Sequence, residues 1–229
     1  MRISKYLADM GYCSRRQAEK LIKEGLISVN AQVLKSPAFL VQETDVVKVK
    51  DWVVKRKEKV TNVYAFYKPK GYVTSTEDTK GRPTVFDILP KGMERVVKIG
   101  RLDYNTEGLL LFTNDGDYAR KMELPSSGLK RKYIVKTFGK ITQERLDKLK
   151  NGTCLDGVMY GTFIATILEQ RNNICKIEVE IAEGKNREVR KVLGSFGLMV
   201  AKLKRTQYGP YKLERLAVGE FKKVGVLVF

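Results

Sequence analysis

The sequence predicts an α+β protein in which a small N-terminal unit precedes a larger mixed domain. Apolar residues recur with helical spacing over residues 3–24, and short strand-like segments follow over 26–50. The stretch 51–62 is polar, charge-dense and without a buried face, as is typical of a linker. Beyond it, apolar strand-like runs alternate with helical segments. We therefore expect one domain with its linker at residues 1–60 and another at 61–229.

The charge balance predicts a polyanionic partner. The 229 residues include 44 Lys and Arg against 26 Asp and Glu, a formal net charge of +18. Such a charge favours nucleic acid as the partner ahead of an anionic membrane. Residues 1–60 contribute +6 and the remainder +12, so both domains can attract it. The sequence has no apolar stretch of about 20 residues and does not begin like a secretory signal, so we expect a cytoplasmic protein without a membrane span.

Cysteine and histidine usage excludes several kinds of chemistry. The three cysteines, Cys13, Cys154 and Cys175, are far apart, form no CxxC pair, and are accompanied by no histidine. This argues against a structural zinc site and excludes a Ser-His-Asp triad. Any catalysis must depend on carboxylates, Lys, Arg, Tyr, Cys or Ser. We expect the cysteines to be small core residues in a reducing compartment.

The N-terminal segment predicts a short basic helix. Ser14 is followed three residues later by Gln17, the pattern of a capping box, and Gly25 is placed to end the helix. Residues two apart in a helix point about 200° apart, so the basic side chains fall opposite the apolar face. These basic residues are Arg16, Lys20 and Lys23.

The larger domain is expected to contain several strands and two main helices. The continuous apolar run 109–112 predicts a strand buried on both faces. The other predicted strands are 63–67 continued by 72–75, 133–136, the antiparallel pair 162–168 and 174–181, 199–204 and 224–229. The main predicted helices are 142–150 and 186–196.

Three segments are candidates for chemistry. Asp103 lies on a glycine-bounded loop directly before the apolar strand, and loops held by a strand often carry catalytic groups, although a cap or turn role is the commoner one. Gly184 opens a helix rich in Arg and Lys, which suits anion binding or, more simply, a solvated face. The basic cluster that ends at Tyr133 suits phosphate contact with base stacking, or a strand with Tyr133 in the core.

These segments together resemble a known family. The run GRLDYNTEGLLLFTNDG is similar to the signature of pseudouridine synthases of the RsuA/RluB type. The run KPKG before it, KY after it, and GKNREVRK followed by LKRT resemble the remaining motifs of that family, in the same order. The N-terminal run SRRQAEKLIKEGLISVN resembles an S4 RNA-binding domain. The resemblance covers essentially the whole chain, and it implies an S4 domain followed by a catalytic domain with a largely antiparallel mixed sheet and a central RNA-binding cleft.

The resemblance also implies roles for individual residues. Asp103 matches the catalytic aspartate, and Arg190 matches its basic partner, which would stabilise the ionised carboxylate. Tyr133 matches the aromatic residue that stacks on the target uracil, and Leu203 an apolar residue beside that ring. Arg101 is a candidate phosphate or base-flipping contact. Lys68 is expected near the substrate, or else as a structural part of its turn. The expected phosphate contacts of the S4 domain are Arg15, Arg16, Lys20 and Lys23.

The implied reaction is the isomerisation of uridine in structured ribosomal RNA. It involves no redox change or group transfer, so we expect no cofactor and no metal, and one ionised carboxylate can act as nucleophile or base. Residues 138–156 and the NREVR motif resemble the large-subunit branch more closely than the small-subunit branch. We expect a monomer. The alternatives are a synthase for small-subunit ribosomal RNA or tRNA, and a non-catalytic RNA-binding or ribosome-assembly protein.

Overall fold

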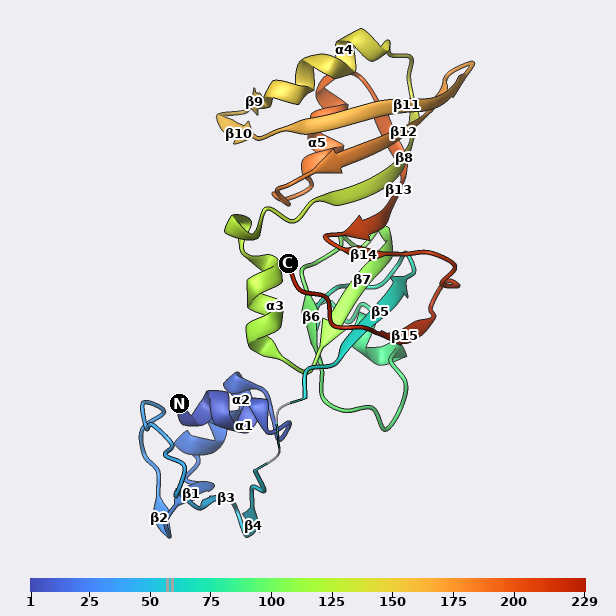
Figure 1. Ribbon diagram of the computed structural model, residues 1–229. Helices are drawn as coiled ribbons and strands as arrows, with labels where there is room; N and C mark the ends of the chain where they lie inside the picture. The colour runs from blue at the N-terminus through green and yellow to red at the C-terminus, as the bar shows by residue number, and fades with distance from the viewer. Residues whose placement is uncertain (57, 59) are drawn as a thin grey trace. The chain divides into compact units, whose positions relative to one another are not determined.

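The computed structural model describes residues 1–56, 58 and 60–229 and divides into two compact units (Figure 1). The first unit contains residues 1–61, 92–97 and 114–116, and the second contains 62–91, 98–113 and 117–229. The division after residue 61 lies beside the predicted boundary, whereas the two short later segments of the first unit were not predicted. Lys57 and Lys59, which fall in the predicted linker, lie outside the described residues.

The first unit packs two helices against a small sheet. Its elements are α1 (Ile3–Asp9), α2 (Arg15–Lys23), β1 (Ile27–Val29), β2 (Gln32–Val33), β3 (Val47–Val49) and β4 (Trp52–Val53). The strands are antiparallel in the order β2-β1-β3-β4. Helix α2 begins with the predicted capping box, in which the side chains of Ser14 and Gln17 each accept a bond from the other's backbone N–H. The predicted linker was placed too early, because β4 and the buried Val54 belong to this unit.

The second unit is built on a nine-stranded sheet whose main path is β11-β12-β8-β13-β7-β5-β15. Its strands are β5 (Val63–Lys68), β6 (Val97–Ile99), β7 (Glu107–Thr113), β8 (Arg131–Phe138), β11 (Phe163–Arg171), β12 (Ile174–Ile181), β13 (Met199–Tyr208), β14 (Tyr211–Lys212) and β15 (Phe221–Val224). Along this path β7 and β13 run parallel, and the other neighbouring strands are antiparallel. The predicted pairing of β11 with β12 is confirmed, as is the α+β class with its largely antiparallel sheet.

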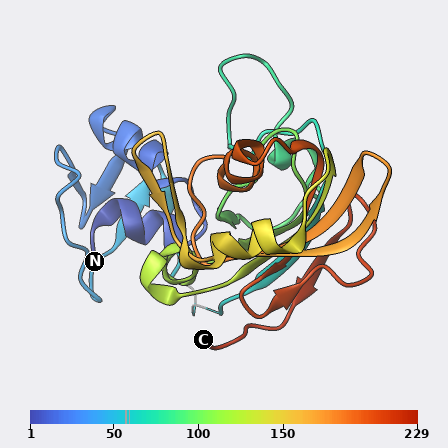
Figure 2. The ribbon, with the colours of Figure 1, turned by 90° about the horizontal axis from the view of Figure 1, so that it is seen from above.

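Shorter elements complete the second unit. They are η1 (Val85–Ile88), α3 (Gly116–Glu123), η2 (Pro125–Ser127), α4 (Gln143–Asp147), η3 (Lys148–Asn151), the hairpin β9 (Thr153–Leu155) with β10 (Val158–Tyr160), and α5 (Glu188–Ser195). Helix α4 contacts β11, and α5 contacts β13 (Figures 1 and 2). In the described part of the chain, no helix combines the length and apolar character needed to cross a membrane.

Several sequence expectations were wrong in detail. Residues 72–75 do not continue β5, since only Val73 forms an isolated bridge, to Thr84. The last strand ends at Val224 rather than beginning there. Helix α3 was not predicted. Cys13 and Cys175 are buried as expected, but Cys154 is exposed.

The two central strands are held close together by a glycine. Gly108 has a φ of +107° and lies opposite Arg205 in the parallel pairing of β7 with β13. A Cβ at this position would lie 2.2 Å from the carbonyl oxygen of Arg205, so no other residue fits without moving one strand. This contact fixes the start of β7, which continues directly from the loop that contains Asp103.

Lys68, at the end of β5, is a fully buried cation that supports the same loop. Its Nζ donates to the carbonyl oxygens of Pro69 at 3.0 Å, Asp103 at 3.2 Å, Tyr104 at 3.5 Å and Thr106 at 2.9 Å. Burial lowers the pKa of Lys68 to about 8, and the nearby charge of Asp103 offsets part of this shift. The side chain is therefore a structural support for the loop, which is the second of the two roles expected for it, and no part of it is exposed for direct contact with a substrate.

The lowered pKa of Lys68 predicts a pH-dependent stability. Below about pH 8 the lysine is charged in both the folded and the unfolded protein. Between about pH 8 and pH 10.5 the unfolded protein binds more protons at this site, so folding becomes more favourable as the pH rises. We expect the free energy of unfolding of the wild type, relative to Lys68→Met, to increase by about 2 kcal/mol between pH 7.5 and pH 10. Urea unfolding of both proteins followed by circular dichroism measures this, and a difference that does not change with pH contradicts it.

Candidate active site

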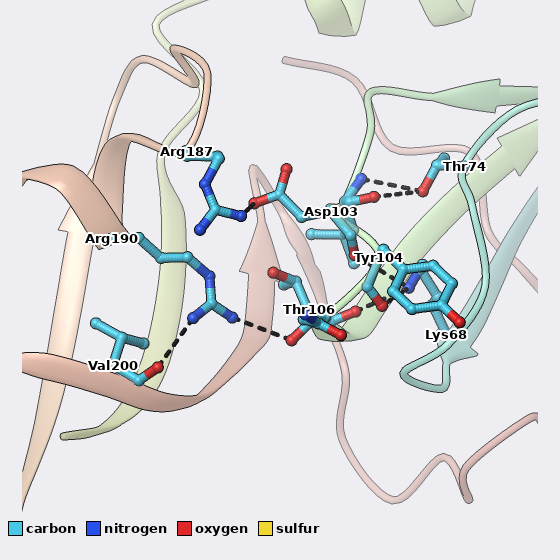
Figure 3. Close-up of polar contacts among 10 residues, drawn as sticks. Lys68, Thr74, Asp103, Tyr104, Thr106, Arg187, Arg190 and Val200 are labelled. Carbon is cyan, nitrogen blue, oxygen red and sulfur yellow. Dashed lines mark hydrogen bonds and ion pairs between the residues drawn. The ribbon is translucent and has the colours of Figure 1, made fainter. Parts of the chain in front are cut away.

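The loop 101–106 has no regular secondary structure, yet each of its backbone carbonyls accepts a hydrogen bond. Thr74 Oγ1 donates to the carbonyl oxygen of Leu102 at 2.6 Å and accepts from the Leu102 N–H at 3.2 Å. Lys68 donates hydrogen bonds to the carbonyls of residues 103, 104 and 106 (Figure 3). Buried polar groups must be paired to avoid a large desolvation cost, so these contacts leave the backbone little freedom to rearrange.

Two arginines complete the support of the loop. Arg205 of β13 is buried, and its Nε donates to the carbonyl oxygen of Leu109 at 2.7 Å while Nη1 reaches that of Arg101 at 3.5 Å. Arg190 of α5 donates from Nη2 to the carbonyl oxygen of Asn105 at 3.1 Å and from Nη1 to that of Val200 at 3.0 Å. Three cations from three elements therefore hold one short segment.

Asp103 projects from this loop toward the start of α5. Its side chain is 35% exposed, so a substrate can reach it, and one carboxylate oxygen lies 4.0 Å from Nη1 of Arg187 (Figure 3). The predicted direct ion pair of Asp103 with Arg190 is not formed, because the Arg190 guanidinium is engaged with the carbonyls of Asn105 and Val200. Arg190 is still close enough for the charge of Asp103 to influence it.

Arg187 reaches Asp103 because of an unusual backbone conformation. It precedes α5 with φ +52° and ψ +30°, the left-handed region that is unfavourable for residues with a Cβ. The helix therefore begins at Glu188 rather than at the predicted residue 186. The preceding loop is anchored by Arg131, whose Nη1 donates to the carbonyl oxygens of Ala182 at 2.6 Å and Glu183 at 3.1 Å. These hydrogen bonds to the preceding loop stabilise the unfavourable backbone conformation of Arg187.

Arg190 is partly desolvated in this site. Burial lowers the pKa of its guanidinium, the neighbouring Arg187 lowers it further, and the carboxylate of Asp103 raises it. Two guanidinium groups consequently lie on the α5 side of one half-exposed carboxylate. This arrangement stabilises negative charge at Asp103 or on an anionic group that approaches it.

Tyr133 and Leu203 lie on one face of the sheet, on the neighbouring strands β8 and β13. Tyr133 pairs with Arg205, and Leu203 pairs with Val135, in the antiparallel register of these strands. Arg205 in turn pairs with Gly108 at the start of β7, so Tyr133 is two strands away from the end of the Asp103 loop. Both side chains are buried, with exposed fractions of 7% and 4%, which makes them candidates for the wall of the site.

The other predicted contacts are placed as follows. Arg101 is exposed at the start of the loop. In the first unit, the four basic side chains of α2 that were predicted to contact phosphate are all exposed, and Lys20 lies 3.8 Å from Glu24. These are Arg15, Arg16, Lys20 and Lys23.

The basic cluster before Tyr133 has a different role from the predicted phosphate contact. Lys130 and Lys132 pair with Glu180 of β12 at 2.8 and 3.3 Å, and Arg131 is engaged with backbone carbonyls. These cations are therefore used within the sheet, and the simpler strand interpretation fits them better.

Three residues of the site were missed in the sequence, namely Thr74, Arg187 and Arg205. Arg205 stands inside a motif that the resemblance identified, but its burial depends on the glycine opposite it. Arg187 and Arg190 are both present in NREVR, and only the late start of α5 decides which of them reaches Asp103. No local pattern distinguishes Thr74.

Comparison with known proteins matches both parts of the chain to known families. Residues 62–195 match the model for RNA pseudouridylate synthase, and residues 1–47 match the S4 domain. A solved structure described as a pseudouridylate synthase aligns with a TM-score of 0.69 and 24% identity, covering 98% of this chain and 96% of that chain, which shows the shared fold.

Curated relatives cover almost the full length. An uncharacterized RNA pseudouridine synthase of Rickettsia bellii is 42% identical over 223 residues, which are 97% of this chain and 96% of the relative. The ribosomal large subunit pseudouridine synthase B of Bacillus subtilis is 36% identical over 225 residues, 97% of this chain and 91% of the relative. That of Vibrio vulnificus is 40% identical, over 93% of this chain and 68% of the relative. The chain belongs to the RNA pseudouridylate synthase family, whose members are isomerases, and has an S4 domain at its N-terminus.

Proposed function

We propose that this enzyme converts a uridine of large-subunit ribosomal RNA to pseudouridine, with Asp103 as the catalytic carboxylate. The observation that supports this most strongly is the half-exposed Asp103 side chain on a loop bound at every carbonyl, with two arginines beside it. Catalysis by a single group requires such fixed placement, because small displacements of a reacting group cost much of the rate. We also expect the enzyme to act in the cytoplasm, where ribosomes are assembled.

The chemistry requires little beyond one carboxylate and a rigid site. The bond between uracil N1 and ribose C1′ breaks, the base turns, C5 bonds to C1′, the proton on C5 is released, and N1 takes up a proton from the solvent. Asp103 would assist either as a nucleophile at C1′ that is later displaced, or as a base that removes and returns a ribose proton. Arg187 and Arg190 would stabilise its ionised form in a site from which the base excludes water.

Large-subunit RNA is the proposed substrate because the relatives named ribosomal large subunit pseudouridine synthase B align with nearly the whole of this chain. The target uridine must leave its stack or pair to reach Asp103, at a cost of a few kcal/mol. Tyr133 would offer a stacking surface for the extruded base, with Leu203 packed beside it. The exposed basic side chains of α2 would bind phosphates of the same RNA, so that a structured substrate is held by both domains.

We expect Asp103→Asn to abolish turnover while RNA binding is retained or strengthened. The amide keeps the shape of the side chain but can act neither as a base nor as an effective nucleophile, and the change removes negative charge from a basic surface. Loss of about 10³-fold or more in single-turnover rate is expected. The measurement is tritium release from a large-subunit RNA transcript labelled at uridine C5.

Asp156→Asn is the matched control, because Asp156 is exposed in the β9–β10 turn with φ +51°, a conformation that Asn tolerates well. It should keep wild-type activity. Tritium release by Asp103→Asn at a rate close to that of the control would remove Asp103 from the chemistry.

Arg187 and Arg190 should be separable by their effects on stability. Arg190→Ala removes the charged donor from the carbonyl of Val200, in a partly buried contact, and from that of Asn105, in an exposed one. It should lower the free energy of unfolding by about 1 to 2 kcal/mol, besides lowering turnover. Arg187→Ala should change stability by less than about 0.5 kcal/mol, because the side chain is 51% exposed, yet lower turnover about tenfold or more. Urea unfolding and single-turnover rates test both. Wild-type turnover in Arg187→Ala would show that the ion pair with Asp103 is not used.

The aromatic ring of Tyr133 can be tested apart from its hydroxyl. Tyr133→Phe should retain most activity because the stacking face survives. Tyr133→Leu, which keeps an apolar side chain in this buried position, should lose about 1 to 3 kcal/mol of base stacking, seen as a lower kcat/KM. Equal activity of the Leu variant and the wild type would exclude stacking, and a strong loss in the Phe variant would point to the hydroxyl instead.

A further inference from the structure

A basic hollow lies on the sheet face opposite Tyr133 and Leu203. Side chains alternate between the two faces of a strand, and the residues that flank these two buried positions are exposed or half-exposed. The hollow has a volume of about 550 Å³ and lies over β8, β12, β13 and the start of β7. The tip of the β11–β12 hairpin, which can be seen in Figure 1, contributes Arg171, Asn172 and Ile174 to its lining. It is therefore separate from the candidate active site.

Five cations and two carboxylates line the hollow, which gives it a net charge of +3. The cations are Lys136, Lys176, Lys202, Lys204 and Arg171, and the carboxylates are Glu107 and Glu169. Glu169 is already paired with Arg171 at 2.9 Å. Among the described residues, no carboxylate lies within ion-pair distance of any of the four lysines.

Three of these lysines stand side by side across the sheet. Lys202 of β13 is directly opposite Lys136 of β8, which is directly opposite Lys176 of β12. Like charges in opposite positions of neighbouring strands, about 5 Å apart, destabilise a sheet. Another row of the same face has opposite charges in register, since Lys132 of β8 lies opposite Glu180 of β12 and forms an ion pair with it. The lysine row therefore does not stabilise the fold, and a bound anion would offset the repulsion between the three positive charges.

We propose that this lysine row, Lys136, Lys176 and Lys202, binds the sugar–phosphate backbone of an RNA segment other than the one that contains the target uridine. The proposal rests on the RNA substrate of the proposed function and adds a second contact surface on the reverse face of the catalytic domain. RNA fits better than a single small anion, because the lysines are spread across three strands over an open hollow. A long ribosomal RNA can place a second segment on this face while its target uridine lies at Asp103, whereas a short hairpin cannot reach both.

The test compares two triple variants with equal loss of charge. One is Lys136→Gln, Lys176→Gln, Lys202→Gln. The matched control is Lys212→Gln, Lys222→Gln, Lys223→Gln, which replaces three exposed strand lysines of the same domain. Dissociation constants for a full-length large-subunit RNA transcript are measured over a range of KCl concentrations, together with single-turnover rates at saturating RNA and melting temperatures.

We expect the row variant to bind the transcript about tenfold more weakly, with a salt dependence smaller by about 2 in the slope of log K against log salt. Its rate at saturating RNA should equal that of the wild type, and its melting temperature should not fall, because repulsion has been relieved. The control should change affinity less than about threefold.

Equal losses of affinity in the two triple variants, or no loss in the row variant, would overturn the proposal. The second result would favour an acidic protein as the occupant of the hollow. If the wild-type protein binds the transcript and the row variant binds it more weakly as expected, but the wild type forms no pseudouridine, the proposed function is overturned and the lysine-row proposal is not.

Discussion

The candidate site depends on cations that bind backbone carbonyls rather than carboxylates. The loop 101–106 has no helix or strand of its own to satisfy its polar groups, and Lys68, Arg190 and Arg205 supply donors from three other elements. Burying a cation is costly, and burying an unpaired carbonyl is also costly, so each offsets the penalty of the other. The result is a rigid loop whose one carboxylate is not consumed by the internal hydrogen bonds. Asp103 is thereby left available for substrate.

The close pairing of β7 with β13 links the sheet to this loop. Their parallel pairing requires Gly108, since any side chain there would meet the backbone of Arg205. The close approach also brings the buried Arg205 side chain to the carbonyls on either side of the turn. Fold and site therefore share one set of contacts, and a change that separates these strands would be expected to harm both.

The sequence predicted the parts of the fold that local patterns encode. The capping box at Ser14, the apolar strand β7 and the β11–β12 hairpin each depend on residues near one another in the chain. Arg187 was missed because its left-handed backbone is set by contacts with the surrounding loop, and helical periodicity favours an earlier start for α5. The role of Lys68 was left open because burial depends on residues 35 to 38 positions away. The proposed catalytic role of Asp103 came from the family resemblance, and the tertiary contacts explain how its loop is held rigid.

The central claim is that this rigidly held carboxylate modifies large-subunit ribosomal RNA. Its most direct test is to map pseudouridines in ribosomal RNA from cells that lack the gene, complemented with wild-type enzyme, with Asp103→Asn, or with neither. The account predicts that one or more large-subunit pseudouridines disappear without the gene and return only with the wild-type enzyme. An unchanged large-subunit map in cells without the gene, or restoration by Asp103→Asn, would contradict it.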